Sequence, residues 1–468
     1  MSSLLDVAPS TIVARLAAGN TTDATPAEIR TLLSLTDAGV KAAYEANADT
    51  NAFTDALLAK LNGIEAAADV TDALNVIAAL DGAAIPAVTP VGADKLLLQD
   101  SGSSDALGYA AITDILALSS GASVNLLYNG NFNIWQRGTT FTGIANAYGA
   151  DRWAWRNVGA GVVDMLRSTD VPNGLSVYSC QIDVTTADAA LAVTDFYGLE
   201  YRIEGLDAIP LGFGTATAQS VAISFWVKSA KTGIHSVALQ NSAVNRSYVA
   251  EYTVDVADTW EKKTVVIAGD TSGTWLKTNG IGVAVIFALA AGTNFTGAAG
   301  AWAAADNKAS TNQVNVMDNA ANNFRISQVQ LEIGTSAGAF SPRQFTDEYR
   351  LCKRYYQKTF PLDVTPATGT GQEGSLSYRT IIAGVNSYQF QLDFDTEMRD
   401  DPSGGTTYYN PVNANTNWHN LTLALDSGAT AAPATASNAK RIYISNPQVA
   451  GDALLNFQAV HATFEIEL

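Results

Sequence analysis

The chain has 468 residues, of which 47% are hydrophobic and only 15% are charged, and its formal net charge is −18. At about 150 residues per domain this length predicts roughly three domains, and the acidic charge argues against nucleic acid as a partner because it repels phosphate backbones. The longest apolar run, residues 281–291, is shorter than the ~20 residues that a membrane-spanning helix needs, so no membrane insertion is expected.

Cysteine and histidine are too rare for a disulfide scaffold or a local metal site. Cys180 and Cys352 are either two separate buried thiols or one long-range disulfide. His235, His419 and His461 lie too far apart in the sequence to form a local metal-binding motif. The N-terminus lacks the basic region that begins a secretory signal, so no signal peptide is expected.

The first quarter of the chain is predicted to hold short helices, in an attachment or stalk segment over residues 1–84. A capping box with proline at the first helical position occupies residues 25–28, and a second helix is expected from Thr54 to a C-cap at Gly63. Helices this short are marginally stable alone in water. We therefore expect self-association, with neighbouring chains supplying the missing core.

A small connector module is predicted over residues 85–122. Residues 96–100 form a strand-like run, residues 101–105 form a turn cluster, and residues 107–112 return as a second strand-like run. A short helix is expected to follow as far as Leu118, and residues 119–123 are typical of a linker.

Residues 123–340 are predicted to form a β-sandwich of the jelly-roll type. Strand-like runs at 221–227, 263–267, 282–287 and 324–331 are separated by turns and show no intervening helical periodicity. A linking helix is expected within 341–360, because Phe345, Tyr349, Cys352 and Tyr356 share one helical face, and Pro361 is expected to stop it.

The last segment, residues 361–468, is predicted to be a smaller C-terminal β domain. Apolar residues alternate along 388–394 and again along 460–468, which places them on one face of a strand in each case. The predicted fold class is therefore mainly β, with a short helical N-terminal segment, a β-sandwich jelly roll and a small C-terminal β domain.

Two glycine-rich patterns match catalytic or nucleotide-binding motifs but lack their structural context. Residues 334–338 match G-x-S-x-G around Ser336, and His461 with Asp395 would complete a hydrolase order, yet no helix is expected directly after the serine. Residues 369–374 match G-x-G-x-x-G, but a strand-like run follows where phosphate binding needs a helix N-terminus. We interpret them as an exit loop and a turn, and expect no enzyme.

A cluster of carboxylates lies on the strand that precedes residue 398. Asp393, Asp395 and Glu397 share one strand face, and oxygen ligands so close together could hold calcium. EF-hand spacing fails because Met398 occupies the glycine position. A solvated acidic strand face is the favoured interpretation, and no cofactor is expected.

Several motifs resemble, in the same order, segments of bacteriophage tail fibres and tail appendages with a jelly-roll module similar to carbohydrate-binding modules. They are NLLYNGNFNIWQRG at 125–138, DRW at 151–153, FWVK at 225–228, QVQLEIG at 328–334, FSPRQF at 340–345, LCKRYY at 351–356, ATPAEIRTLL at 24–33, residues 44–55 through 61–65, and Met398-Arg399 with Pro402 close behind.

This resemblance implies a virion structural protein that contributes to host attachment. It implies a homotrimer, an N-terminus bound to other tail or baseplate proteins, and a host cell-surface glycan as the partner of the jelly roll. The chain would be made in the host cytoplasm and reside in the virion. Jelly-roll binding modules often carry a structural calcium ion, so a metal elsewhere in residues 125–335 stays open. A structural connector without a receptor site is the alternative, followed by a glycan deacetylase or depolymerase.

Aromatic residues in loops are the candidate glycan contacts, because flat rings receive the apolar faces of sugars. Trp275 and Trp302 lie in Gly-, Ala-, Thr- and Asn-rich segments whose small neighbours cannot bury them locally. Tyr408, Trp418 and His419 alternate with asparagines that offer amide donors, a combination typical of polar-ligand recognition. Packing against a neighbouring strand or chain is the alternative for each ring. The acidic net charge favours a neutral glycan.

Overall fold

The computed structural model describes residues 124–379, 387–430, 432–433, 437–447 and 456–468, together with 13–15, 21–23, 27, 37–46, 59–60, 95–100 and 106–111. The chain divides into two compact units, Met1–Thr113 and Asp114–Leu468. The division falls inside the predicted connector, residues 85–122.

The described residues of the N-terminal unit include two pairs of antiparallel strands and helix α2. Strands β1 (Val13–Arg15) and β2 (Thr21–Asp23) pair with each other, and so do β3 (Lys95–Asp100) and β4 (Ala106–Ala111). The pairing of β3 with β4 confirms the two strand-like runs predicted at 96–100 and 107–112, and the turn cluster predicted at 101–105 lies outside the described residues. Helix α2 spans Asp37–Glu45. Of the capping box only residue 27 is described, and of the helix expected from residue 54 only residues 59–60, and all three are helical. The helix expected after residue 113 lies outside the described residues.

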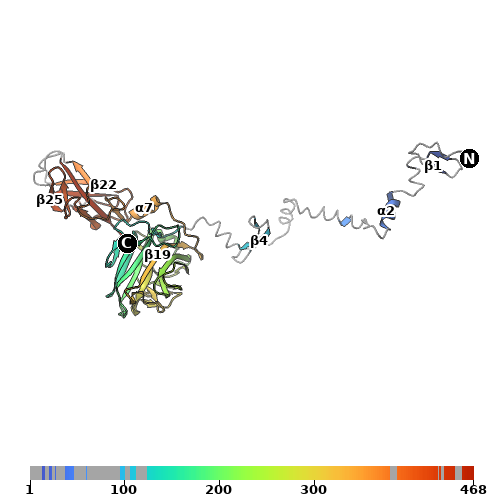
Figure 1. Ribbon diagram of the computed structural model, residues 1–468, viewed down its shortest axis with the longest axis horizontal. Helices are drawn as coiled ribbons and strands as arrows, with labels where there is room; N and C mark the ends of the chain where they lie inside the picture. The colour runs from blue at the N-terminus through green and yellow to red at the C-terminus, as the bar shows by residue number, and fades with distance from the viewer. Residues whose placement is uncertain are drawn as a thin grey trace. The chain divides into compact units, whose positions relative to one another are not determined.

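Two antiparallel sheets form the sandwich, the green-to-yellow body labelled β19 in Figure 1. The seven-stranded sheet contains, in spatial order, β17 (Trp302–Ala303), β13 (Ser247–Val254), β12 (Gly233–Gln240), β15 (Ile281–Ala291), β10 (Phe196–Glu204), β7 (Trp153–Val158) and β6 (Ala147–Tyr148). The six-stranded sheet contains β14 (Glu261–Ile267), β11 (Val221–Ser229), β19 (Asn323–Ile333), β9 (Ser179–Thr186), β8 (Val162–Ser168) and β5 (Thr140–Phe141). This architecture confirms the predicted fold class and all four predicted strands.

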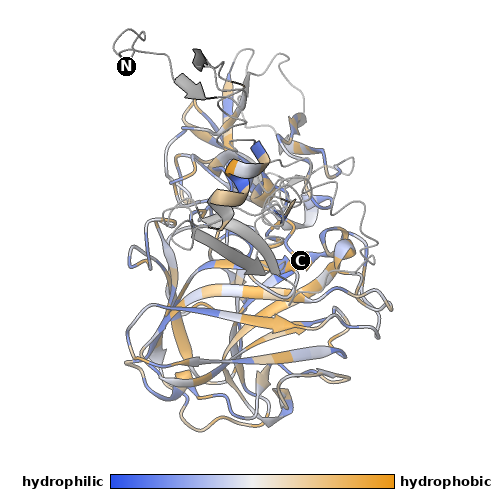
Figure 2. Ribbon diagram, turned by 90° about the vertical axis from the view of Figure 1, so that its right-hand side faces the viewer, coloured by the Kyte–Doolittle hydropathy of each residue, from blue (hydrophilic) through white to orange (hydrophobic). Residues whose placement is uncertain are grey.

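The facing surfaces of the two sheets bury the main core, and Figure 2 shows apolar residues running along the strands of the sandwich. Strand β15 is buried on both faces: Val285 and Phe287 enter the main core, whereas Ala284 and Ile286 point to the outer face of the seven-stranded sheet. A segment with β16 (Thr296–Gly297) and β18 (Ala309–Ser310) covers part of that outer face, where Ser310 N–H donates to Ser236 Oγ (2.9 Å). Small alanines on β12 and β15 let the covering segment lie close to the sheet.

The core contains one buried histidine with an unpaired nitrogen. His235 is 0% exposed, its ring stacks on Tyr252 (centroids 5.5 Å apart), and Nε2 lies 3.0 Å from the carbonyl oxygen of Lys231. Its Nδ1 has no hydrogen-bond partner. Burial lowers the pKa of His235 to about 4, because the charged ring is poorly solvated there.

The jelly roll is therefore expected to lose stability on acidification through His235. The unfolded ring has a pKa near 6.5, so the unfolded state binds more protons between pH 6.5 and about 4, and stability falls as the pH falls through this window by up to about 3 kcal/mol. Thermal unfolding of the parent and of His235→Phe should be compared across that range. In the difference between the two unfolding free energies, the contributions of all titrating groups that the two proteins share cancel. A difference that does not change with pH would contradict the prediction.

The C-terminal domain, orange to red with labels β22 and β25 in Figure 1, contains two antiparallel sheets. One is built on β28 (Phe457–Glu465), with β20 (Tyr356–Lys358), β21 (Leu376–Arg379), β23 (Thr406–Tyr409), β24 (Asn417–Asn420) and β25 (Leu425–Thr430). The other contains β22 (Ser387–Asp393), β27 (Arg441–Pro447) and β26 (Ala432–Pro433). These elements confirm the strand predicted at 388–394 and the one predicted at 460–468 as far as Glu465, where β28 ends.

The linking helix is shorter than expected. Helix α7 covers Phe345–Lys353, and Tyr356, which was expected on the same helix, belongs to strand β20. The extension to Pro361 was wrong because β20 pairs with β28, with Tyr356 opposite Glu465, and this pairing replaces the last helical turn.

Cys180 and Cys352 are both free and fully buried, which confirms separate thiols. Among the described residues, no helix is long and apolar enough to cross a membrane.

Candidate functional site

Two of the predicted contact rings lie together in an aromatic cluster rather than as exposed rings. Trp275 is only 8% exposed, and its indole N–H donates to Asp270 Oδ2 (3.2 Å). Trp302 is half-buried on β17, and its indole N–H donates to the carbonyl of Ala268 (2.7 Å). The two rings meet edge to face at 5.4 Å and both pack on Phe213. The expected loop exposure is wrong for Trp275 and only partial for Trp302.

The other three predicted residues lie on strands of the C-terminal domain and are buried. Tyr408 on β23 is 4% exposed, Trp418 on β24 is 0% exposed, and His419 is 4% exposed. Trp418 and Tyr408 belong to the core of that domain. Their predicted exposure in a loop is therefore wrong, and no flat ring face is left there for a sugar.

Asp426 explains why the Asn-rich loop folds inward. His419 Nδ1 lies 2.7 Å from Asp426 Oδ1, and the side-chain amides of Asn410 and Asn415 donate to the same carboxylate at 2.8 and 2.7 Å. Burial raises the pKa of Asp426, but the hydrogen bonds from His419 and the asparagines outweigh it and lower the pKa to about 2. The amides that suggested ligand recognition bind the protein itself.

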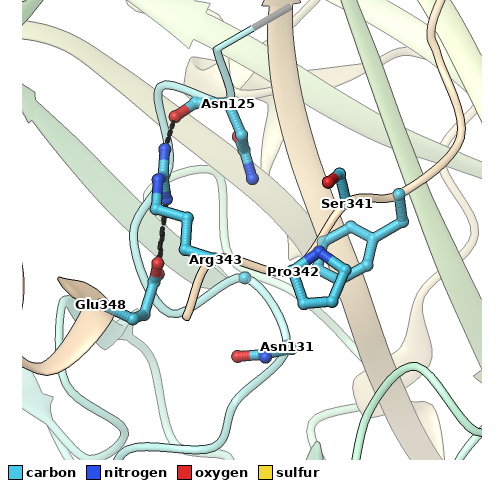
Figure 3. A pocket seen from close by; sticks show the side chains of 8 residues that line it. Asn125, Asn131, Ser341, Pro342, Arg343 and Glu348 are labelled. Atoms are coloured by element: carbon cyan, nitrogen blue, oxygen red, sulfur yellow. Dashed lines mark hydrogen bonds and ion pairs between the residues drawn. The ribbon is translucent and has the colours of Figure 1, made fainter. Parts of the chain in front are cut away.

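The sequence motifs of the jelly-roll opening meet at one buried joint. Arg343 donates to the carbonyl of Leu127 (3.0 Å) and pairs with Glu348 (3.1 Å), as Figure 3 shows for the ion pair. The pocket drawn there, with Asn131 on one side, has a volume of only about 10 Å³, which is room for about one water. The joint ties residues 125–131 to helix α7 and has no space for a ligand.

The DRW motif anchors the end of the C-terminal domain. Asp151 accepts hydrogen bonds from the backbone N–H (2.7 Å) and side-chain amide (2.8 Å) of Gln136. Arg152 pairs with Glu467, and Arg137 pairs with the same carboxylate at 3.0 Å. The Glu467 side chain is only 4% exposed and is the ion-pair partner of the buried Arg152, whereas Arg137 also pairs with Glu465 at 3.2 Å and with Asp151 at 3.7 Å.

The candidate hydrolase residues are not brought together. The segment around Ser336 leaves β19, and the next helix begins at Phe345. His461 has both ring nitrogens engaged, by Thr359 Oγ1 (3.0 Å) and the carbonyl of Gly371 (3.0 Å). Asp395 pairs with Lys353 at 2.9 Å. The strand predicted after the G-x-G-x-x-G turn is present as β21.

The acidic strand face is tied to cations. Asp393 pairs with Arg441 at 2.5 Å, and Glu397 pairs with Lys440 at 3.4 Å. Within the part of the chain that the structure describes, no three His, Cys, Asp or Glu side chains are grouped so as to hold a metal ion. A calcium ion remains a prediction from the resemblance alone.

A further candidate site is a groove that local sequence patterns did not predict. It lies on the outer face of the seven-stranded sheet and has a volume of about 310 Å³, within the range of about 300–1,000 Å³ typical of ligand pockets. Its lining residues are Asn146, Arg156, Asn157, Val158, Phe196, Glu200, Arg202, Gln240, Val244, Ile286, Phe295, Asp306 and Lys308.

Apolar side chains from three separate segments supply one wall of the groove. Phe196 on β10 and Phe295 in the covering segment meet edge to face, with centroids 6.0 Å apart. Ile286 lies on β15, directly opposite Glu200 of β10 in the strand register. Gly198 makes room for this arrangement, because a Cβ there would come within 2.7 Å of the Phe196 ring.

Charged and amide groups surround the apolar wall. Glu200 accepts one hydrogen bond from Arg156 Nε (2.7 Å) and one from Arg202 Nε (2.9 Å). Asp306 accepts from the Gln240 amide (2.6 Å) and pairs with Lys308, whose ammonium lies 4.2 Å from the centre of the Phe295 ring. The groove therefore combines an apolar surface with a small number of fixed polar groups, as small-molecule sites do.

One apolar residue at the groove is held in an unfavourable backbone conformation. Val244 has φ +48° and is 50% exposed, and positive φ is a genuine outlier for a β-branched residue. Asn241 holds this turn, because its side-chain oxygen accepts from the backbone N–H groups of Asn245 and Arg246 at 3.1 Å each. Strain of this kind concentrates at functional sites.

Comparisons with known proteins give only remote similarities. No family model and no curated protein matches the sequence. Among solved structures, the enzymatically active domain of tailspike protein 4 of bacteriophage CBA120 is 14% identical over 45% of this chain, with a TM-score of 0.25. This chain covers only 22% of that tailspike chain.

Two carbohydrate-binding modules are similarly distant. The family 11 module of the cellulase Lic26A-Cel5E of Clostridium thermocellum is 14% identical over 42% of this chain and 96% of its own, with a TM-score of 0.22. TmCBM61, in complex with β-1,4-galactotriose, is 13% identical over 45% of this chain and 100% of its own, with a TM-score of 0.23. At such TM-scores these similarities carry no argument, so the candidate site rests on its own geometry.

A sequence signal for the groove does exist. In residues 196–202 (FYGLEYR), Phe196, Glu200 and Arg202 alternate with Tyr197, Leu199 and Tyr201, which are buried in the main core. This period of two marks a strand with a core face and a second, chemically mixed face. The partners Arg156, Ile286 and Lys308 come from distant segments, and only the folded sheet brings them to this strand.

Proposed function

We propose that this chain is a carbohydrate-binding protein and that the groove of the seven-stranded sheet is its glycan site. One observation carries the proposal: a single groove of about 310 Å³ has an apolar wall containing Phe196 and Phe295 opposite carboxylate, amide and cationic groups. Apolar C–H faces of a sugar pack on the partly exposed ring of Phe295, which the buried Phe196 supports from below, and the hydroxyl groups of the sugar exchange hydrogen bonds with Glu200, Gln240 and Asp306. Recognition of this type needs no reaction at the bound sugar.

We further propose that the site works without catalysis. The serine, histidine and aspartate that could form a hydrolase set are engaged in separate places, with His461 bound to Thr359 and Gly371. In the groove, both carboxylate oxygens of Glu200 already accept hydrogen bonds from guanidinium groups, one from Arg156 and one from Arg202.

The role in a virion is part of the same proposal. The ordered motifs at 125–138, 151–153, 328–334 and 340–356 resemble bacteriophage tail appendages, and this resemblance supports host attachment as the purpose of glycan binding. A homotrimer is proposed because the short N-terminal helices need partners. Its N-terminal segment would bind other tail or baseplate proteins, so that three glycan sites act together.

Removing the Phe295 ring should weaken glycan binding while leaving the fold intact. Phe295 is only partly buried, and losing the area that its ring offers to a sugar should cost about 1.5–3 kcal/mol, or roughly 10–100-fold in affinity. Binding of the full chain to an array of bacterial surface glycans should be compared for the parent and Phe295→Ala.

Phe345→Ala is the matched control, because it removes a ring that is 49% exposed at the start of α7, away from the groove. It should bind glycans like the parent. If the parent binds no glycan, or if Phe295→Ala binds as well as the parent, the groove is not the receptor site. The structural connector would then be the better explanation.

The full chain should behave as a trimer, with the N-terminal segment contributing to assembly. Mass photometry is expected to give about three chain masses for the full-length protein and a lower mass at dilution after residues 1–122 are removed. A mostly single-chain mass at full length would contradict the trimer. An unchanged trimer after the deletion would place assembly in the β domains.

A further inference from the structure

We infer that the groove selects acidic saccharides, in which a sugar carboxylate binds between Arg156 and Arg202. This inference rests on the proposed function and narrows it to a ligand class. It also replaces the expectation of a neutral glycan, which was based on the net charge of −18. The reason is that the charges lining the groove differ in sign from the charge of the whole chain.

The groove carries an excess of positive charge. Its lining side chains include three cations, Arg156, Arg202 and Lys308, and two carboxylates, Glu200 and Asp306, so these side chains leave one positive charge unbalanced. Lys308 and Asp306 form a pair at one end. The excess therefore lies at the other end, where two guanidinium groups share the single carboxylate of Glu200.

The two guanidinium groups are held in place before any ligand binds. Arg156 donates to Glu200 and to the carbonyl of Asn146 (3.4 Å), and its charge lies 5.2 Å from the centre of the Tyr148 ring. Arg202 donates to Glu200 and to the carbonyl of Leu468 (2.5 Å). Groups fixed in this way lose little conformational freedom on binding, which favours affinity.

Each guanidinium keeps donors for a ligand. An arginine side chain has five N–H donors, and the contacts just described use the Nε and one Nη group of each arginine. The side chains of Arg156 and Arg202 stay 21% and 25% exposed, whereas Glu200 is 10% exposed. A carboxylate matches the remaining planar donors better than a hydroxyl does, because charge-assisted bonds are stronger.

Distant acidic residues do not cancel this local field. Charges farther apart than about 8 Å are largely screened at physiological ionic strength. Glu467, the acidic residue next to Leu468, is already paired with Arg137 and Arg152. A bound acidic sugar would therefore place its carboxylate at the Arg156–Arg202 end and its hydroxyl groups toward Gln240 and Asp306.

The test uses pairs of oligosaccharides that differ at the sugar carboxyl group, which is charged in one member and methyl-esterified and neutral in the other. Isothermal titration of the full chain should compare oligouronides of the galacturonate, glucuronate and mannuronate types with their neutral methyl esters. We expect the acidic member of at least one pair to bind at least tenfold more tightly, with the preference shrinking as salt is raised from about 0.1 M to about 1 M.

The outcomes separate this inference from the proposed function. If neutral members or other neutral glycans bind as tightly as acidic ones, the chain is a carbohydrate-binding protein without the inferred selectivity. If no glycan of either kind binds, the proposed function itself fails.

Arg156→Gln should abolish the acidic preference, because Glu200 and Arg202 would then balance each other. Arg167→Gln is the matched control: it removes the same charge, also beside a tyrosine ring (4.3 Å from Tyr178), but on β8 of the other sheet. It should keep the preference of the parent. Arg156→Lys retains the charge without the planar fork and should reduce the preference only partly. Unchanged selectivity in both Arg156 variants would overturn the inference.

Discussion

Replacing Glu467 by Gln is expected to destabilise the Asp114–Leu468 unit by about 3–5 kcal/mol, because it leaves buried charge unpaired. The charge left unpaired is that of Arg152, which is 1% exposed and pairs with Glu467, whereas Arg137 keeps Glu465 and Asp151 as partners. The glutamine keeps the shape of the side chain and removes its charge. Urea unfolding followed by intrinsic fluorescence should show a lower transition midpoint, with loss of the C-terminal domain first.

Asp395→Asn provides the control for an exposed ion pair. Asp395 is 78% exposed and pairs with Lys353, so its loss should cost less than about 1 kcal/mol. Equal effects of the two substitutions would mean that the joint at Glu467 is no more important than a surface ion pair. The glycan affinity of folded Glu467→Gln should stay near that of the parent, because Glu467 does not line the groove.

Replacing Trp418 by Ala is expected to cost about 3–5 kcal/mol and to unfold the C-terminal domain at a lower temperature. The ring is 0% exposed, packs edge to face with Phe390 (6.4 Å), and its indole N–H donates to the carbonyl of Ser445 (3.2 Å). Its removal leaves a cavity and deletes the hydrogen bond to Ser445. Differential scanning calorimetry of the full chain should show the lower transition.

Leu425→Ala is the control within the same domain. Leu425 is 50% exposed and should change stability by less than about 0.5 kcal/mol. Trp418→Ala should leave the glycan affinity of the jelly-roll groove unchanged, since the two sites share no residue. A Trp418→Ala protein that keeps its thermal stability but loses glycan binding would restore this ring as a contact residue.

Local sequence patterns were sufficient for the strands and for the fold class. The runs at 221–227 and 324–331 became β11 and β19, because alternating or continuous apolar residues are stable only as buried strands in such a chain. The hairpin of β3 and β4 followed from its turn cluster in the same way. The end of helix α7 could not be predicted in this way, because β20 pairs with β28, about a hundred residues later, and residues 356–358 therefore form a strand instead of extending the helix.

The candidate site shows the opposite case. A tryptophan beside small or polar neighbours is locally unprotected, yet Trp418 is buried because Asp426 gathers the asparagines and His419 around itself. The groove depends on Arg156, Phe196 and Lys308, which meet only because β7 pairs with β10 and the covering segment folds over the sheet.

The sequence by itself therefore determined that this protein is a mainly β chain with a sandwich, since strand formation depends on residues two positions apart. Only the tertiary structure decided which side chains face solvent. Exposure depends on what packs against each face of a strand, and for Phe196 and Trp418 those partners come from segments far along the chain.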